Sequence, residues 1–537
     1  MQRKSQNPFT IKSLDQEALQ SDLENPLILQ PSNIDHDVVD SADVCIIGSG
    51  CGGAVCAKEI GEAGHKVIIV EEGGYYTSRD FTMREDDAYA KLYKDRASQT
   101  TDDLSITILQ GRCVGGSSTV NWTTSLRTPE WVLAEWGQKF GVQGLSRREL
   151  DPYFEKVEKY LNIHVVPDHD HNPNNRIILE GSRKLGYRAQ PTSRNEEGCL
   201  QCGFCGLGCP FDVKLSVNLT YVPDALHHGA TLYANARAEI IELKGKTKIV
   251  KGSILDNQSN RVVHKFEITA PIVIVAASAI NSPVLLLRSN LANSSGQVGK
   301  TLTLHPTTAV FGLFEEIIDP AYGIPQSATC DEFLNRDGDG TGFWIEAVPV
   351  QPALAAISLP EFGETHRRLM RMFPHIGASI ILVKDTDSEG EVKANEHSRP
   401  VISFNLGRHD LETMKHGIKV AAQIHFAAGA REVTTLHVKK TTIRSPAEID
   451  RLVDGANFDT NSIVIYSAHP LGTCRMGENP KTAVVNSHCE THDVQGLFVC
   501  DGSVTPTSLG VNPQVTIMGI ATKTAEYINE NFSRWVR

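Results

Sequence analysis

The sequence has no long hydrophobic run and no excess of basic residues. Its longest apolar stretch, residues 270–280, includes Pro271 and Ser278 and is well short of the roughly 18 residues that a spanning helix needs. The first residues are polar and lack the apolar centre of a secretory signal. The 52 basic and 64 acidic side chains are interspersed and give a net charge of −12, which repels phosphate backbones and anionic lipids. We therefore expect no membrane span and no nucleic-acid partner.

The chain is long and has an ordinary globular composition. It has 537 residues, of which 40% are hydrophobic, enough for about three domains at a typical ~100 to 200 residues each. A chain of this size buries a core without disulfide bonds. We therefore expect its twelve cysteines to be mostly reduced thiols in a cytoplasmic protein, and a small molecule to be its partner.

A strand–turn–helix–strand unit begins at residue 42. Residues 42–47 and 66–70 are short β-prone apolar runs, and residues 54–63 between them have helical composition. This order predicts two parallel strands joined by a crossover helix in an α/β sheet. Similar runs at residues 272–275 and 497–500 are expected to join the same sheet, which would make the domain discontinuous.

Two further segments are predicted to be helical. Residues 147–161 have the pattern of an amphipathic helix. Residues 1–38 are polar, with helical character at 14–23, and are expected to form an N-terminal arm or a surface helix.

The turn of the first unit carries Gly48, Gly50 and Gly53 in the spacing of a dinucleotide-binding loop. The first glycine of such a loop makes the tight turn, the second lets the backbone approach a pyrophosphate, and the third permits close packing of helix on strand. Glu71 ends the second strand, where a carboxylate can accept hydrogen bonds from ribose hydroxyls. The alternative interpretation is a glycine-rich turn in an unrelated α/β sheet.

A second loop rich in glycine and serine follows at residues 111–121. Its sequence, Gly-Arg-Cys-Val-Gly-Gly-Ser-Ser-Thr-Val-Asn, resembles the first signature of the glucose-methanol-choline (GMC) family of flavin oxidoreductases. Residues 278–286 look like the second signature. The motifs at 469–477, 501–503 and 510–513 follow in the family's order, so the resemblance extends from about residue 43 to the C-terminal helix.

The resemblance implies two α/β domains around a noncovalent FAD. A Rossmann-like FAD-binding domain would be assembled from residues 39–130, 215–310 and 465–537. Residues 131–214 and 311–464 would form an α+β substrate-binding domain built on an antiparallel sheet. Besides the glycines of the first loop and Glu71, the cofactor-binding residues that it implies are Gly115, Gly116, Ser117, Asn121, Asp501 and Gly502.

His469 and Asn512 occupy the positions of the family's active-site pair. A neutral imidazole can take the hydroxyl proton of an alcohol near neutral pH, and an amide N–H can stabilise the alkoxide-like charge that develops. The Asn-Pro form at 512–513 resembles cholesterol oxidases and long-chain fatty alcohol oxidases, which favours lipophilic alcohols. Glu346 lies in an apolar Glu-x-x-Pro setting similar to that of a catalytic glutamate in cholesterol oxidases; a glutamate at a strand end near solvent is the alternative.

Four cysteines gather in one short segment. The Cys-x2-Cys-x2-Cys-x3-Cys-Pro spacing of a bacterial ferredoxin loop is formed by Cys199, Cys202, Cys205 and Cys209. Long-chain alcohol oxidases share a cysteine-rich segment of this kind. A [4Fe-4S] iron–sulfur cluster, a tetrathiolate zinc ion and a purely structural loop are the three interpretations of this segment.

The resemblance implies FAD-dependent oxidation of a hydrophobic alcohol, long-chain or similar to a sterol or terpenoid, to an aldehyde or ketone. Oxygen or a separate electron carrier would reoxidise the flavin, and a cluster at the cysteines would favour the carrier. Two other functions compete with this one. They are a flavin-containing lyase of the same fold, which works without net redox change, and a non-catalytic flavin-binding protein.

Overall fold

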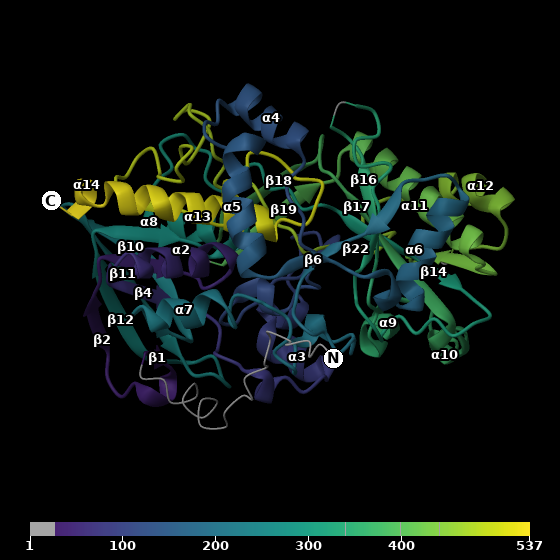
Figure 1. Ribbon diagram of the computed structural model, residues 1–537, viewed down its shortest axis with the longest axis horizontal. Coiled ribbons are helices and arrows are strands. Elements are labelled where there is room, and N and C mark those ends of the chain that lie inside the picture. Colours follow the sequence, from purple (N-terminus) through teal and green to yellow (C-terminus); the bar gives the residue numbers. More distant parts are fainter. Residues whose placement is uncertain (1–26, 339, 398, 440, 537) are drawn as a thin grey trace, which may run out of the picture.

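The structure, a computed structural model, describes residues 27–536 apart from 339, 398 and 440. The helix expected at 14–23 lies outside the described residues. The described chain is built around two large sheets, each with its own hydrophobic core, and the two halves lie side by side in Figure 1.

The first large sheet has six strands, all of them parallel. Four of them, β3, β4, β13 and β23, are buried at every residue, as expected for a parallel sheet covered on both faces. In spatial order the strands are β1 (Ile28–Leu29), β9 (Thr231–Tyr233), β4 (Val67–Val70), β3 (Val44–Ile47), β13 (Ile272–Val275) and β23 (Leu497–Val499). The four strands predicted from the apolar runs are confirmed. β1, by contrast, lies in the segment expected to be an arm. It forms the edge of the sheet, where buried Ile28 pairs with Leu232 of β9.

Helices cover this sheet and bring distant segments together. α2 packs against α7 and α13, and α13 also packs against α5. The predicted β3–α2–β4 unit is confirmed, although α2 begins at the glycine loop itself. The predicted amphipathic helix is α5, which buries Leu150, Phe154 and Val157 in the core of the parallel sheet. The bounds are α2 (Cys51–Glu62), α5 (Arg147–Tyr160), α7 (Tyr221–His227) and α13 (Gln514–Asn531).

The second large sheet is mostly antiparallel, as the resemblance implied, and packs against α6 (Pro173–Lys184) and α11 (Arg408–Ala428). β22 and β5 extend it from segments near the cofactor loops. Its strands are β21 (Thr442–Ile443), β20 (Glu432–Thr435), β14 (Thr307–Leu313), β17 (Ile376–Val383), β16 (Phe343–Ala347), β15 (Ala328–Cys330), β7 (Ala189–Pro191), β22 (Ile465–Ser467) and β5 (Ile106–Ile108).

Smaller elements complete the described fold. One four-stranded sheet contains β10 (Ala236–Lys244), β11 (Thr247–Leu255), β12 (Val262–Ala270) and β2 (Val38–Ser41). Two strand pairs are β18 (Glu389–Ala394) with β19 (Pro400–Asn405) and β6 (Ile163–Val165) with β8 (Ser193–Asn195). The other helices are α3 (Glu85–Leu92), α4 (Glu130–Phe140), α8 (Ser278–Ser289), α9 (Pro352–Ser358), α10 (Gly363–Arg371), α12 (Ile449–Asp454) and α14 (Ser533–Val536).

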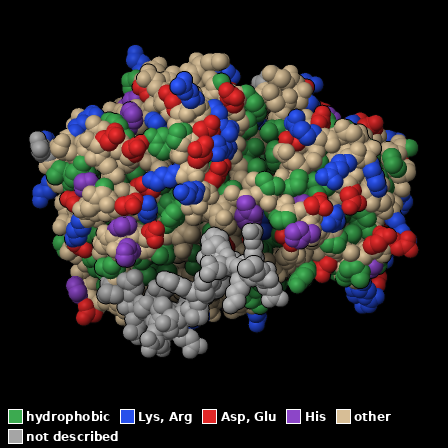
Figure 2. All heavy atoms as spheres, viewed as in Figure 1, with side chains coloured by type: hydrophobic (Ala, Val, Ile, Leu, Met, Phe, Trp, Pro, Cys, Tyr) green, Lys and Arg blue, Asp and Glu red, His purple; other side chains and the backbone are tan. Residues whose placement is uncertain are grey.

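The surface carries mixed charge. Acidic and basic side chains are interspersed on the face that Figure 2 shows. None of the helices in the described part of the chain has the length and apolar character of a membrane span.

Candidate active site

A cavity of about 1700 Å³ is lined by residues from both large sheets. Pockets for single drug-sized ligands typically have volumes of about 300 to 1000 Å³. This cavity therefore has room for a dinucleotide together with a second small molecule. Both glycine-rich loops and all three candidate catalytic residues line it.

The first glycine loop leaves space at the N-terminus of α2. Gly48 has a φ of +103°, and a Cβ there would lie 2.3 Å from the carbonyl oxygen of Ala276. A Cβ at Gly53 would lie 1.9 Å from the Gly48 oxygen, whereas one at Gly50 would meet nothing closer than 4.0 Å. Gly50 faces the cavity and is the N-cap of α2 without a side-chain capping bond. The loop is therefore an open cradle at a helix N-terminus, which could hold a phosphate group.

Glu71 lies beneath this loop. Its Oε2 accepts hydrogen bonds from the N–H (3.0 Å) and the hydroxyl (2.8 Å) of Ser49, and its Oε1 accepts one from the N–H of Gly73 (2.8 Å). Burial raises the pKa of this carboxyl group, and those hydrogen bonds oppose the rise. An ionised carboxylate offers about four acceptor positions, so Oε1 keeps one for a ribose hydroxyl.

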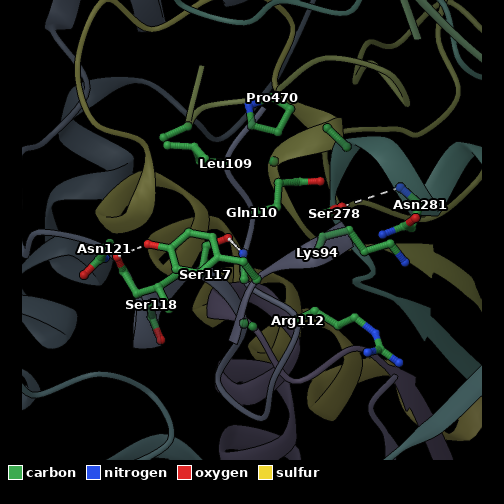
Figure 3. A pocket seen from close by; sticks show the side chains of 18 of the residues that line it. Lys94, Leu109, Gln110, Arg112, Ser117, Ser118, Asn121, Ser278, Asn281 and Pro470 are labelled. Carbon is green, nitrogen blue, oxygen red and sulfur yellow. Dashed lines mark hydrogen bonds between the residues drawn. The ribbon is translucent and has the colours of Figure 1, made fainter. Parts of the chain in front are cut away.

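The second loop packs directly on the first. Gly115 and Gly116 have φ values of +91° and +54°, and a Cβ at Gly116 would lie 3.0 Å from the Cα of Gly50. The N–H of Gly115 donates to the Ser49 hydroxyl (3.1 Å), which links this loop to Glu71. The Ser117 hydroxyl accepts from the N–H of Gly111 (3.0 Å). Ser117 and Asn121 line the cavity, as Figure 3 shows.

Two polar contacts bring distant segments to this loop. The Asn121 amide donates to Oε1 of Gln514 (2.8 Å), the first residue of α13. Asp501 accepts hydrogen bonds from the N–H of Ser278 (2.9 Å) and the hydroxyl of Ser282 (2.5 Å) on α8. Gly502 follows it in the cavity wall. The C-terminal motif therefore meets both signatures at the cavity.

Glu346, on β16, is 0% exposed, so it does not lie near solvent. Its Oε2 accepts a hydrogen bond from the side-chain amide of Gln326 (3.1 Å), and its Oε1 has no partner among the described residues. Burial raises the pKa of Glu346 to about 7, and contacts with Trp344, Asn512 and Gln326 partly oppose this rise. Near neutral pH this carboxylate can take up a proton.

His469 lines the cavity beside a second histidine that sequence analysis missed. Its Nδ1 lies 3.1 Å from Nδ1 of His305. Burial lowers the pKa of His469 to about 4, so its ring is neutral at pH 7. Nothing in the local sequence marks His305, because its contacts with His469, Leu509 and Gly510 exist only in the folded chain.

Sequence comparisons agree with this geometry. Sequence models of the GMC oxidoreductase family match residues 67–307 and 386–521, and that of an FAD-binding domain matches 43–81. An uncharacterised GMC-type oxidoreductase of Mycobacterium tuberculosis is 30% identical over 518 residues, which cover 96% of this chain and 80% of that protein. The chain belongs to the GMC oxidoreductase family. It is therefore an FAD-dependent oxidoreductase that acts on CH–OH groups.

Other similar proteins differ in the substrates that their names mention. Long-chain-alcohol oxidase FAO3 of Arabidopsis thaliana is 29% identical over 91% of this chain and 68% of its own. The 2-methyl-1,2-propanediol dehydrogenase of Mycolicibacterium austroafricanum is 26% identical over 92% of this chain and 96% of its own. Among solved structures, pyridoxine 4-oxidase from Mesorbium loti has a TM-score of 0.69 at 18% identity, covering 91% of this chain and 99% of that one. A variant formate oxidase of Aspergillus oryzae has a TM-score of 0.71 at 17% identity, covering 93% and 100%. Both structures show the shared fold.

In this GMC oxidoreductase many apolar side chains line the cavity beyond the candidate catalytic residues. The strands β14 and β17 of the antiparallel sheet contribute apolar side chains to it, together with the segment between β16 and α9 and with α9 itself. The apolar residues that line this part are Ala309, Phe311, Val348, Val350, Leu354, Ile380, Leu382 and Leu436.

The four clustered cysteines line a separate small cavity of about 10 Å³, which has room for about one water molecule. Guanidinium nitrogens of buried Arg194 lie 3.6 Å from Sγ of Cys205 and 3.9 Å from Sγ of Cys199. Buried Lys214 donates to the carbonyl oxygen of Cys205 (2.9 Å). In the described part of the chain no three side chains of His, Cys, Asp or Glu are placed to hold a metal ion.

Proposed function

We propose that this GMC oxidoreductase oxidises a hydrophobic alcohol to an aldehyde or ketone. The observation that carries the proposal is the apolar wall from β14, β17 and the segment after β16, in the same cavity that His469, Asn512 and Glu346 line. An apolar wall favours a substrate with a large apolar surface, because burying that surface removes it from water. The long-chain-alcohol oxidase among the relatives supports this substrate class.

FAD would be held by the loop cradle described above. The pyrophosphate would lie at Gly50 and the N-terminus of α2, the ribose at Glu71, and the second loop at Gly115 to Ser117 would close over the cofactor. When bound, FAD supplies the acceptor for the hydride of the alcohol.

The side chains at the cavity would supply the polar half of the reaction. Asn512, whose Oδ1 is buried without a partner among the described residues, can donate its N–H to the alcohol oxygen as negative charge develops. His469 and Glu346 lie in the same wall, and one of them must accept the hydroxyl proton. The apolar side chains around them exclude water, which strengthens these interactions.

Anaerobic mixing with long-chain 1-alkanols tests the proposal. Loss of the visible absorbance of oxidised flavin, faster for hexadecanol than for butanol or glucose, is the expected result. Product formation with an unchanged flavin spectrum would support the lyase instead. Equal flavin reduction by glucose and hexadecanol would refute the apolar substrate class.

An alternative route for the electrons uses the clustered cysteines. Arg194 and Lys214 are buried and have no carboxylate partner among the described residues, which favours negative charge nearby, as four thiolates around an iron–sulfur cluster would provide. The thiols as placed do not form a metal site, so this route requires them to move. If oxygen accepts the electrons directly from the flavin, we expect the purified protein to contain no iron and no acid-labile sulfide. If a cluster relays the electrons, we expect the protein to contain both and to reduce an electron carrier faster than it reduces oxygen.

We also propose a cytoplasmic location. All twelve cysteines are free thiols in the structure, as expected in a reducing compartment. Titration of the denatured, non-reduced protein with a thiol reagent should find all twelve. A count that is lower by pairs would indicate disulfides and an oxidising compartment.

A further inference from the structure

The buried His305 and the half-buried His469 share a single proton position at the catalytic end of the cavity. The rings of His305 and His469 meet edge to face, with centroids 5.2 Å apart and planes at 88°. Their Nδ1 atoms are 3.1 Å apart. Two lone pairs, or two N–H groups, would repel each other at this distance. One Nδ1 must therefore carry a proton and the other must accept it.

The backbone decides which ring carries that proton. Nε2 of His305 accepts hydrogen bonds from the N–H groups of Leu509 (3.2 Å) and Gly510 (3.0 Å). A proton on Nε2 would point at two donors and leave both of them buried without an acceptor, at a cost of about 1 to 3 kcal/mol each. A neutral His305 therefore carries its proton on Nδ1. It donates that proton to Nδ1 of His469, and the neutral His469 ring keeps its own proton on Nε2.

We propose that His305 locks His469 in the Nε2–H tautomer, so that His469 donates a hydrogen bond to the alcohol oxygen and the hydroxyl proton passes to Glu346. The inference rests on the proposed alcohol oxidation. Nε2 of His469 has no partner among the described residues, and its ring lines the cavity. Both positions where His469 could accept a proton are used: Nδ1 by His305 and Nε2 by its own hydrogen.

The reaction balances with this assignment. The O–H bond of the alcohol breaks and its proton joins the Glu346 carboxylate, while the C–H bond breaks and its hydride leaves to FAD. The products are a carbonyl compound, a neutral Glu346 and reduced flavin. His469 gains and loses no proton, so its role is to hold the oxygen and stabilise its developing charge.

The groups around the lock preserve it. The buried Asp385 accepts hydrogen bonds from the N–H of His305 (2.8 Å) and from the hydroxyl of Ser508 (2.9 Å), which fixes the two segments that meet at the His305 ring. Burial, then His469, then the charge of Lys384, which precedes Asp385 in the chain, keep the pKa of His305 well below its ordinary value. Glu346 has no charged partner among the described residues; its neighbours are Gln326, Trp344 and Asn512.

Nitrogen-15 NMR of the FAD-loaded, histidine-labelled protein tests the lock directly. The His469 signals are assigned by their loss in His469→Gln. We expect a protonated Nε2 and an acceptor Nδ1 in the wild type, and a mixture of tautomers in His305→Leu. His305→Gln should restore the wild-type pattern, because its carbonyl can accept from Leu509 and Gly510 while its N–H donates to His469. A wild-type His469 protonated on Nδ1 overturns the proposal, even if His305→Leu fails to fold.

Kinetics separate this positioning role from a structural one. In His305→Leu we expect kcat for flavin reduction to fall about tenfold or more with little change in KM, and its pH profile to shift; His305→Gln should recover most of the rate. His425→Gln is the matched control, because His425 is equally buried but bonds to Ser379. His425→Gln should keep the wild-type rate. A loss of kcat in His305→Gln as large as that in His305→Leu contradicts the lock. If no alcohol reduces the flavin, the proposed function fails, whereas the tautomer measurement still decides the lock.

Discussion

The two walls of the cavity are built on different principles. The cofactor wall is made of backbone. A Cβ at Gly53 would collide with the carbonyl oxygen of Gly48, and one at Gly48 with that of Ala276, which follows the neighbouring strand β13. The substrate wall is made of side chains, such as Phe311 on β14 and Glu346 on β16, carried by strands that pair far apart in the chain. The cofactor wall therefore requires glycine at particular positions. Substitutions in the substrate wall, by contrast, can alter the shape of the cavity in small steps.

Their polar groups differ as well. At the cofactor wall Glu71, Ser49 and Gly115 satisfy one another. At the substrate wall Oε1 of Glu346 and Oδ1 of Asn512 are buried without partners among the described residues. Buried polar atoms are rarely left unpaired, so the unsatisfied wall is the one prepared for reacting groups.

The largest effect should come from the cofactor wall. In Gly53→Ala the new Cβ would lie 1.9 Å from the Gly48 carbonyl oxygen, so the loop must move. We expect the purified protein to contain no FAD, as measured by its visible spectrum. Gly137→Ala is the control, because its Cβ meets nothing closer than 3.7 Å in helix α4. FAD retained at full occupancy in Gly53→Ala would show that the cradle is not the cofactor site.

A substitution in the substrate wall should lower the rate of flavin reduction while FAD stays bound. Asn512→Ala removes an N–H donor to the developing alkoxide, and we expect the rate of flavin reduction to fall about 100- to 1000-fold while FAD stays bound. Stopped-flow absorbance with a saturating long-chain alcohol measures it. Asn531→Ala, at the far end of α13, should leave the rate unchanged. A change of less than threefold in Asn512→Ala would remove Asn512 from the active site.

The buried carboxyl of Glu346 should make stability depend on pH. Its folded pKa, raised by burial to about 7 from an ordinary 4.5, means that the folded state holds this proton more tightly than the unfolded state. Its contribution to stability is therefore present below pH 4.5 and is lost as pH rises towards 7. Glu346→Gln should gain stability over wild type by up to about 3 kcal/mol between pH 5 and pH 8.

Urea unfolding of the FAD-free protein at the two pH values measures this difference. The exposed Glu364→Gln on α10 is the control and should show no such gain. A constant difference between Glu346→Gln and wild type from pH 5 to pH 8 would mean that Glu346 is ionised throughout this range.

The smallest effect should be a graded change of specificity. Phe311 lines the apolar wall, and Phe311→Ala would enlarge it. Because a methylene in an apolar pocket contributes only about 1 to 3 kcal/mol, we expect kcat/KM to shift about tenfold towards bulkier alcohols. Phe362→Ala, whose side chain is 91% exposed, should have no effect. An unchanged ratio of bulky to linear alcohols in Phe311→Ala would place the substrate elsewhere.

Local sequence patterns predicted much of the fold and the glycine loops of the cofactor wall. The strands β3, β4, β13 and β23 and the helix α5 follow from apolar runs and helical spacing, because burial of one face selects residues at short intervals. β1 was missed because two residues are too few to form a pattern. α5 was found as a helix, but its packing in the parallel-sheet core was not, since an amphipathic pattern shows which face is buried and not what buries it.

Sequence by itself determined the family, the FAD cofactor and the motifs that carry Gly48, Gly50, Gly53, His469 and Asn512. These features are local, because a backbone cradle needs glycine at fixed short spacings. Only the tertiary structure decided the burial of Glu346 and the contact between His305 and His469. A residue's pKa and the tautomer of a histidine depend on neighbours that the fold brings from distant parts of the chain, and no local pattern specifies them.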